Sequence, residues 1–193
     1  MPTIRITGDA ASDALLSSSP LALLIGMALD QQIPMEKAFR GPQVLQDRLG
    51  LPLSATVIAG REDLAEVFAT PPAIHRFPGS MAGRVQQLAQ HLVDEHGGAA
   101  ENLWAGVRTG PELLGRLAAL PGFGDQKARI FLALLGKQYG VRPRGWREAA
   151  GGYGDDGVRR SVADVTGPDS LLEVRSYKQA QKQKAKQTAA ARG

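Results

Sequence analysis

Apolar residues recur with the spacing of an α-helix through almost the whole chain, and this periodicity is what most restricts its fold. Helices are predicted for six segments, which run from Pro20, from Pro34 to Leu49, from Arg61 to Ala69, from Ser80 to a stop at Gly97, from Pro111, and from about Asp125 to Tyr139. Only residues 3–7, where Ile4 and Ile6 alternate with other residues, have the pattern of a strand, and one such strand builds no sheet. The sequence therefore predicts an all-α protein.

The segment that follows Ser19 is the most apolar part of the chain. Ser19 is a typical N-cap residue, and Pro20 suits the first position of a helix. The residues up to Leu29 are apolar nearly all round. Because a helix without a polar face is stable only when it is buried, we expect this helix at the centre of the molecule.

Missing residue types and patterns exclude several kinds of protein. The 193 residues include no cysteine, which excludes disulfides, cysteine nucleophiles, iron–sulfur clusters and zinc ribbons. The three histidines are scattered, so no histidine-based metal site is expected. No apolar run approaches the roughly 18 residues of a membrane helix, and the N-terminal residues lack the pattern of a signal peptide. We expect a cytoplasmic protein that binds no metal in its active site and no membrane.

Positive charge is concentrated in two segments. The chain has 23 basic and 19 acidic residues, but residues 121–147 and residues 173–193 each hold six basic residues and one acidic residue. This distribution indicates a polyanionic partner, with a solvated tail and a chance cluster as the alternative. We expect a helical domain over residues 1–172 and a basic tail over residues 173–193 that is partly disordered.

The segment Leu120-Pro121-Gly122-Phe123-Gly124 carries the clearest chemical signal. Two glycines one residue apart let the backbone turn tightly and approach a ligand closely, and Phe123 can anchor the turn in the core. The amides that open the next helix then form an anion site, beside which Lys127 and Arg129 add positive charge. The alternative is a tight turn between two helices that binds nothing.

This segment, together with Lys127-Ala128, resembles the helix-hairpin-helix of the HhH-GPD superfamily of base-excision DNA glycosylases, which includes endonuclease III. Residues 20–32 resemble the early buried helix of that family and its glutamine-containing corner. Residues 77–84 resemble the segment that leads into the helix before the hairpin. The resemblance implies a two-lobed helical HhH-GPD fold, with the hairpin at about residues 111–139.

The resemblance also implies how DNA would be bound. Members of the family bend a duplex, grip its phosphates, turn the target nucleotide out of the stack and fill the vacated space with a side chain from the glutamine corner. Gln32 matches that position with Gln31 beside it, unless both are only polar residues that end the helix before Pro34. The DNA-binding residues expected from these motifs are Gln31, Gln32, Gly122, Phe123, Gly124, Gln126, Lys127 and Arg129. The expected partner is double-stranded DNA, bound by a monomer, and the hairpin of such a protein can hold a monovalent cation.

Two positions of the family pattern carry other residues here. Gln126 stands where bifunctional members have the lysine that forms a Schiff base, and Lys127 follows about 100° further around the helix. Lys127 is therefore either a displaced nucleophile or a phosphate contact. The catalytic aspartate of the family is expected near Gly145 and Trp146, where this chain has none.

Another carboxylate must then act on the positive charge that glycosidic cleavage builds on the sugar. The candidates are Asp30, Glu148, Asp155 and Asp156. Asp30 ends an apolar helix, where a carboxylate is costly to bury without a partner, so it is either catalytic or paired with an arginine. Trp146 and Tyr153 are candidates for stacking on a flipped base, with surface-capping aromatics as the alternative. His75 is expected to be a structural histidine rather than part of the pocket.

These motifs together predict a DNA glycosylase of base-excision DNA repair, a hydrolase that works at the nucleoid in the cytoplasm. Its substrate is a damaged or deaminated base, and uracil is the first choice because the chain is too short for the extra domains of the adenine and 8-oxoguanine enzymes. AP-lyase activity depends on Lys127. The alternative is a non-catalytic helix-hairpin-helix protein that binds bent or abasic DNA.

Overall fold

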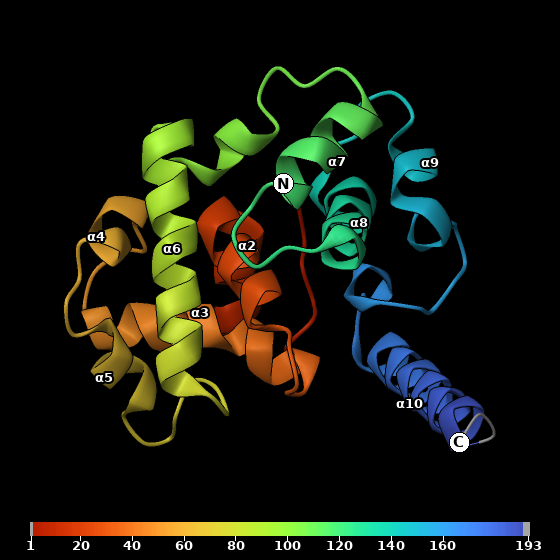
Figure 1. The fold of residues 1–193 in the computed structure, drawn as a ribbon, viewed down its shortest axis with the longest axis horizontal. Coiled ribbons are helices and arrows are strands. Elements are labelled where there is room, and N and C mark those ends of the chain that lie inside the picture. Colours follow the sequence, from red (N-terminus) through yellow and green to blue (C-terminus); the bar gives the residue numbers. More distant parts are fainter. Residues whose placement is uncertain (1, 191–193) are drawn as a thin grey trace.

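The computed structural model describes residues 2–190, and every regular element in it is a helix (Figure 1). The α-helices are α1 (Ala10–Ser18), α2 (Pro20–Leu29), α3 (Met35–Leu49), α4 (Ala55–Ala59), α5 (Leu64–Ala69), α6 (Pro78–His96), α7 (Gly110–Ala118), α8 (Asp125–Leu134), α9 (Trp146–Ala150) and α10 (Pro168–Ala190). Four short helical turns complete the set: η1 (Ala100–Leu103), η2 (Leu135–Tyr139), η3 (Gly151–Tyr153) and η4 (Val162–Asp164). The prediction of an all-α protein is confirmed for the described residues.

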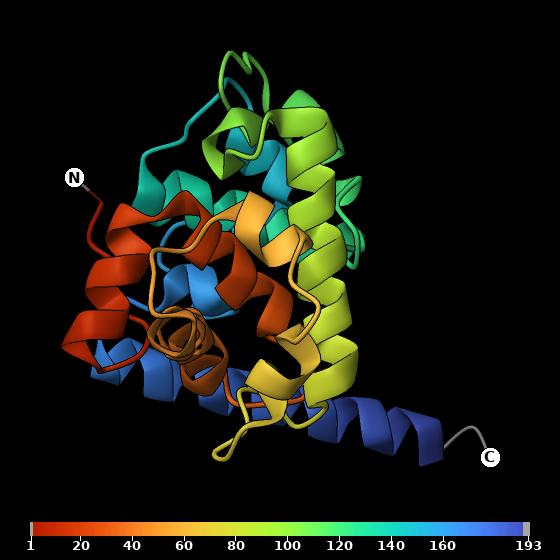
Figure 2. The ribbon, with the colours of Figure 1, turned by 90° about the vertical axis from the view of Figure 1, so that its left-hand side faces the viewer.

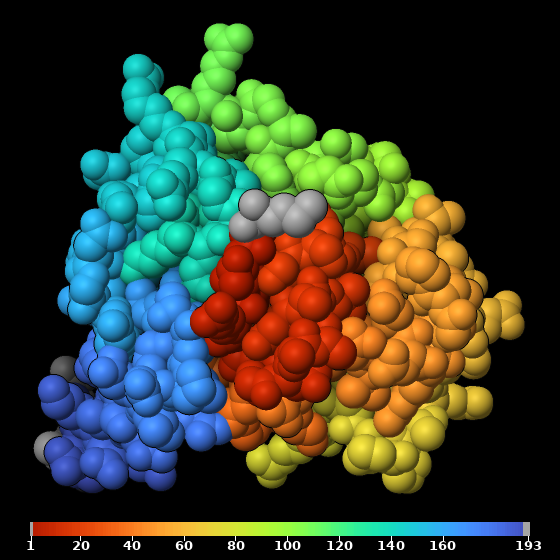
Figure 3. All heavy atoms as spheres, turned by 180° about the vertical axis from the view of Figure 1, so that it is seen from behind, coloured from red at the N-terminus to blue at the C-terminus, as the bar shows by residue number. Residues whose placement is uncertain are grey.

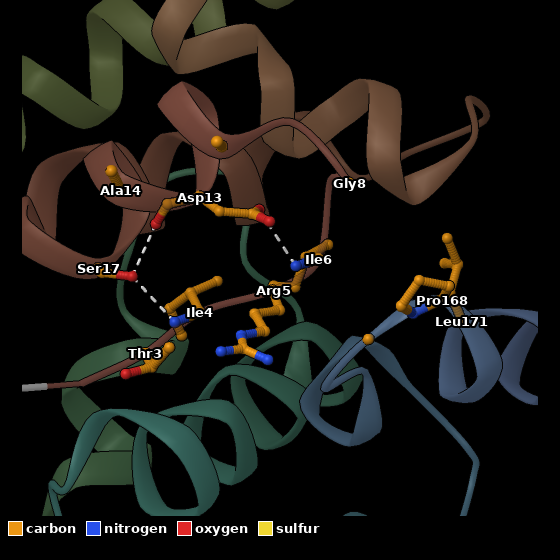
Figure 4. Close-up of a pocket in the computed structure, with 12 residues that line it drawn as sticks. Thr3, Ile4, Arg5, Ile6, Gly8, Asp13, Ala14, Ser17, Pro168 and Leu171 are labelled. Carbon is orange, nitrogen blue, oxygen red and sulfur yellow. Dashed lines mark hydrogen bonds between the residues drawn. The ribbon is translucent and has the colours of Figure 1, made fainter.

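The strand predicted for residues 3–7 does not form, because this segment has no neighbouring strand to pair with in the described part of the chain. Side chains of α1 bind its backbone amides instead. The N–H of Ile4 donates to Ser17 Oγ at 2.9 Å, and the N–H of Ile6 donates to Asp13 Oδ1 at 3.2 Å (Figure 4). The sequence pattern does not predict α1 itself, because α1 has few large apolar residues.

The helices form two groups that share one hydrophobic core (Figure 1). In the first group, α2 packs on α3, while α4 and α5 pack on α6. In the second group, α7, α8 and α9 pack on one another. Seen from behind, the red N-terminal residues lie between the orange residues of the first group and the blue-green residues of the C-terminal part (Figure 3). The predicted hairpin over residues 111–139 thus corresponds to α7, α8 and η2.

α2 is the central helix of the first group, as predicted. Ser19 Oγ accepts the N–H of Ala22 at 3.1 Å, and all residues of the helix after Pro20 are buried. Gly26 lets α3 approach closely, because a Cβ at this position would lie 2.6 Å from the ring of Phe39. Within residues 2–190, no helix alone has the length and apolarity to cross a membrane; α1 and α2 reach that threshold only as a pair that is bent by 115°.

Proline and glycine fix several helix ends. α3 stops at Gly50, whose φ of +68° is left-handed, and α6 stops at Gly97 in the same way, both as predicted. α6 begins at Pro78 rather than at Ser80, because proline takes the first helical position and Phe77 precedes it as the cap. The helix predicted for residues 61–69 is shorter than expected and is preceded by α4.

The C-terminal part is irregular up to α10. Residues 141–167 contain only short helical segments. α10 begins at Pro168 and continues to Ala190, so position 173 lies inside a helix rather than at a boundary. Arg192 of the expected tail lies outside the described residues. Only Ser170 and Val174 of α10 are buried, and the remainder of the helix runs along the surface (Figures 1 and 2).

The contact between α2 and α3 gives a first prediction. Gly26→Ala should lower the free energy of unfolding by about 1–3 kcal/mol, because the new methyl group collides with the Phe39 ring inside a packed core. Urea denaturation followed by circular dichroism measures the change. Gly83→Ala in α6 is the matched control, since nothing lies within 4 Å of a Cβ there, and it should raise stability by about 0.5–1 kcal/mol. Equal effects of the two substitutions would contradict the packing described for α2.

Candidate functional site

Asp30 places a carboxylate at the end of the buried helix α2. Its main-chain N–H donates to the carbonyl of Gly26 at 3.1 Å and ends the helix. The side chain is only 12% exposed, and its Oδ2 lies 3.8 Å from Nζ of Lys178 in α10. Burial raises the pKa of Asp30, while the positive charges of Lys178 and Lys127 oppose that rise. Asp30 is therefore a desolvated carboxylate that lysines from two other helices compensate.

Lys127 reaches the same place from the first turn of α8. Its Nζ donates to the carbonyl oxygen of Ala28 at 3.1 Å and lies 5.7 Å from the centre of the Phe123 ring. Burial lowers the pKa of the Lys127 amine, and the negative charge of Asp30 opposes that shift. An amine with a lowered pKa is deprotonated more often at neutral pH and is then a nucleophile. The fold thus brings Lys127 to the end of the helix that precedes Asp30, whereas the sequence suggested an arginine as the partner of Asp30.

The turn between α7 and α8 has the geometry that its two glycines predict. Gly122 has a φ of +78°, and Phe123 is buried with its ring edge-to-face on Phe131 at 6.1 Å. A Cβ at Gly122 or at Gly124 would meet nothing within 4 Å, so this side of the turn is open to a phosphate or to a monovalent cation. Gly124 caps α8 without a side-chain hydrogen bond, which leaves the first amides of the helix without a side-chain cap.

The two glutamines after Asp30 have different environments. Oε1 of Gln31 accepts a hydrogen bond from Arg84 at 2.6 Å, and its carbonyl oxygen lies 2.9 Å from His75 Nε2. Because the N–H of Phe77 donates to His75 Nδ1, the ring is neutral and its proton is on Nε2, which donates to Gln31. His75 therefore fixes the corner, in line with its predicted structural role. Gln32 is exposed and has a φ of +59°.

A cavity of about 1070 Å³ lies beside this corner. Asp30 and Gln32 line it from the corner, and Gln126 and Tyr153 line it from the second group of helices. Nε2 of Gln126 donates to the hydroxyl of Tyr153 at 2.9 Å, which holds both side chains in place. α10 forms the remaining wall of this corner cavity, with Tyr177 and Lys178 among its lining residues. Four of the predicted site residues thus share one cavity, and Lys127 lies next to it.

The other predicted carboxylates lie elsewhere. Asp155 faces Arg160 at 3.5 Å, and Asp156 faces Arg147 at 2.8 Å. Glu148 lines a separate hollow beside Thr109. None of the three carboxylates lines the corner cavity, so the structure does not place Glu148 or Asp155 with Lys127. Glu148 and Asp155 were proposed from their positions in the sequence alone. Nearby arginines pair with Asp155 and Asp156.

Two further candidates have structural positions. Trp146 is buried, and its ring packs so closely on Gly136 that a Cβ there would lie 2.4 Å away, so Trp146 is a core residue rather than a base-stacking one. Arg129 donates to the carbonyl of Ala149 at 2.6 Å and pairs with Asp125 at 2.8 Å. Its guanidinium therefore links α8 to α9 and is already engaged by Asp125 and Ala149.

The sequence did not predict that residues of α10 line the corner cavity. Arg175, Lys178 and Lys182 recur at intervals of three and four residues, which places them on one helix face. This spacing was the available signal, but the sequence does not show which surface the face meets. In the structure all three line the corner cavity.

Another pocket on the surface contains none of the predicted site residues. A second pocket of about 520 Å³ lies between residues 3–8, α1 and the start of α10, and none of the predicted site residues lines it (Figure 4). Residues 2–190 hold no group of three or more His, Asp or Glu side chains arranged for a metal ion.

Comparison of the chain with protein-family models, with curated proteins and with solved structures finds no match.

The environment of His75 predicts how stability depends on pH. Burial lowers the pKa of His75 below its ordinary value of 6.5, so the unfolded chain takes up a proton at a higher pH than the folded one. Its contribution to stability is complete above pH 6.5 and is lost as the pH falls through the folded pKa. The free energy of unfolding should therefore fall between about pH 7 and pH 5.

The variant His75→Gln should flatten this pH dependence, which urea titrations at a series of pH values can measure. Burial also lowers the pKa of His96, so His96→Gln is the matched comparison and should remove a different part of the slope. A pH dependence that His75→Gln leaves unchanged would show that the corner does not need a neutral histidine.

Proposed function

We propose that this protein is a base-excision DNA glycosylase, in which Lys127 and Asp30 act on a nucleotide that enters the corner cavity. One observation carries the proposal: the helix after the Gly-Phe-Gly turn brings an amine of lowered pKa to the end of α2, beside a buried carboxylate at the edge of a cavity. Paired groups with perturbed pKa values in a cleft are typical of catalytic sites.

The surroundings of the pair support DNA as the substrate. The turn at Gly122 and Gly124 exposes backbone amides that can bind a phosphate, and the corner cavity next to it is lined mainly by cationic and amide side chains. Gln32 is exposed beside Asp30, where it can enter a DNA stack once a base has left it. These features agree with the HhH-GPD resemblance of the sequence, including a two-lobed arrangement of the helices. DNA at the nucleoid is then the partner.

The chemistry follows from the states of the two groups. Once its amine has lost a proton, Lys127 attacks C1′ of the extruded nucleotide, the glycosidic bond breaks, and its electron pair leaves with the base. Asp30 carries a raised pKa, so it can exchange a proton with the base or with water and can stabilise the cationic sugar. The nitrogen then loses a proton and expels O4′, which takes up a proton, so that an imine forms at C1′ and the sugar ring opens. Loss of a C2′ proton then expels the 3′-phosphate and cleaves the strand. Lys127 and Asp30 thus take over what Gln126 and the residues near Gly145 cannot supply.

A second candidate is a protein that only binds bent or abasic DNA. It is favoured by the fact that both reactive groups have partners: Lys127 donates to Ala28, and Lys178 faces Asp30. In this case the amine of Lys127 contacts a DNA phosphate and forms no covalent bond.

Incubation with lesion-containing duplexes tests the proposal. Under single-turnover conditions the protein should release base from one member of a panel that contains uracil, hypoxanthine, alkylated and oxidised bases. Asp30→Asn should slow release by about 100-fold or more, because it removes the group that exchanges the proton. If no duplex of the panel loses its base at high protein concentration, the proposed glycosylase activity is contradicted.

Borohydride trapping on abasic DNA tests the role of Lys127. The imine formed by the amine and C1′ is reduced to a stable covalent adduct, which denaturing electrophoresis detects. The adduct should disappear in Lys127→Ala and persist in Lys37→Ala, an exposed lysine of α3 that serves as the control. Base release without any adduct would assign the reaction to water activated by Asp30, and binding without either product would favour the second candidate.

A further inference from the structure

α10 contacts the body through its first part and is exposed beyond it. Its first turns are anchored by buried Ser170 and Val174 and pack on η4. From Tyr177 onward no residue of the helix is buried, and Figure 2 shows the blue helix extending past the lower end of α6. The corner cavity occupies the space between this part of α10 and the residues after Asp30. The cavity thus has two walls from distant parts of the chain.

Both walls carry positive charge. Arg175, Lys178 and Lys182 line the cavity from α10, and Arg76 and Arg160 line it from the body. Asp30 is the one carboxylate among the lining residues. Three carboxylates pair with lining cations, Asp30 with Lys178, Glu36 with Arg175 and Asp155 with Arg160, so the five cations remain in excess. The corner cavity therefore attracts a chain of anionic groups and contacts it from two sides.

The uncharged lining residues suit nucleic-acid bases. Tyr153 lies on the body wall and Tyr177 on the α10 wall, and Gln32 and Gln126 add amide groups between them. Aromatic rings stack on bases of any sequence, and amides hydrogen-bond to base edges. The volume of about 1070 Å³ slightly exceeds the range of about 300–1000 Å³ that holds drug-sized ligands, so a nucleotide with its flanking phosphates has room.

We propose that the corner cavity is a binding site for an unpaired stretch of a DNA strand, with α10 as one of its walls. In a duplex the bases are stacked on one another and their faces are covered, so Tyr153 and Tyr177 cannot stack on them. An unpaired strand presents phosphates to the cations that exceed the three paired carboxylates, and base faces to the two tyrosines, at once. This inference deepens the proposed function, because it names unpaired DNA as the form that reaches Asp30.

Fluorescence anisotropy with labelled DNA tests the site in the full chain. A labelled oligothymidylate of about eight nucleotides should bind at least about tenfold more tightly than a duplex of the same length. Tyr177→Leu should weaken single-strand binding by about tenfold, because one stacking contact is lost. Tighter binding of the duplex, or an unchanged affinity in Tyr177→Leu, would overturn the proposal.

α10 offers a matched pair of lysines for the charge contribution. Lys182 lines the cavity, whereas Lys184 is placed about 200° around the helix and is not among the lining residues. Lys182→Ala should weaken single-strand binding and reduce the slope of log affinity against log salt by about 0.7, and Lys184→Ala should change both less. Equal effects of the two variants would show a diffuse attraction to the helix rather than a site. Circular dichroism should show the helix content of the wild type in each variant.

The two experiments test the glycosylase and the single-strand site independently of each other. Wild-type protein that binds single strands but releases no base from any lesion supports this site and contradicts the glycosylase. Protein that releases base from a duplex and binds single strands more weakly than duplex supports the glycosylase and overturns this inference.

Discussion

The burial of α2 is the constraint on which the site depends. A helix that is apolar all round has to lie in the core, so the residues at its end are carried into the interior with it. Asp30 is the first polar residue after this helix, and its carboxylate is largely desolvated. A buried carboxylate is stable only when protons, hydrogen bonds or cations compensate it. The rest of the site can be understood as the response to that requirement.

Compensation comes from two segments that are far from α2 in the sequence. Lys127 extends from the start of α8 to the last carbonyls of α2, and Lys178 approaches Asp30 from α10. The two lysines bring the hairpin and the C-terminal helix to one corner, where His75 and Arg84 hold Gln31. Removal of one partner from such a cluster leaves an uncompensated charge, which links the chemistry of the site to the stability of the corner.

Local features of the fold could be predicted from the sequence, and long-range ones could not. The cap at Ser19, the stop at Gly50 and the turn at Gly122 follow from the residues themselves, and each is present. The strand predicted for residues 3–7 does not form, because a strand needs a second strand to pair with. Trp146 was misassigned because its partner, Gly136, is revealed only by packing. The wall formed by α10 could not be predicted, since the spacing of its cations defines a face without identifying what that face meets.

Direct measurement of the Lys127 pKa tests the central claim, that Lys127 and Asp30 share one desolvated site. Nuclear magnetic resonance of the lysine side chains across a pH titration gives this value in the wild type and in Asp30→Asn. We predict a pKa below the ordinary 10.5 in the wild type, because burial disfavours the charged amine, and a further fall in Asp30→Asn, because a stabilising negative charge is lost. A pKa at or above 10.5, or one that Asp30→Asn leaves unchanged, would contradict a desolvated site shared by these two residues.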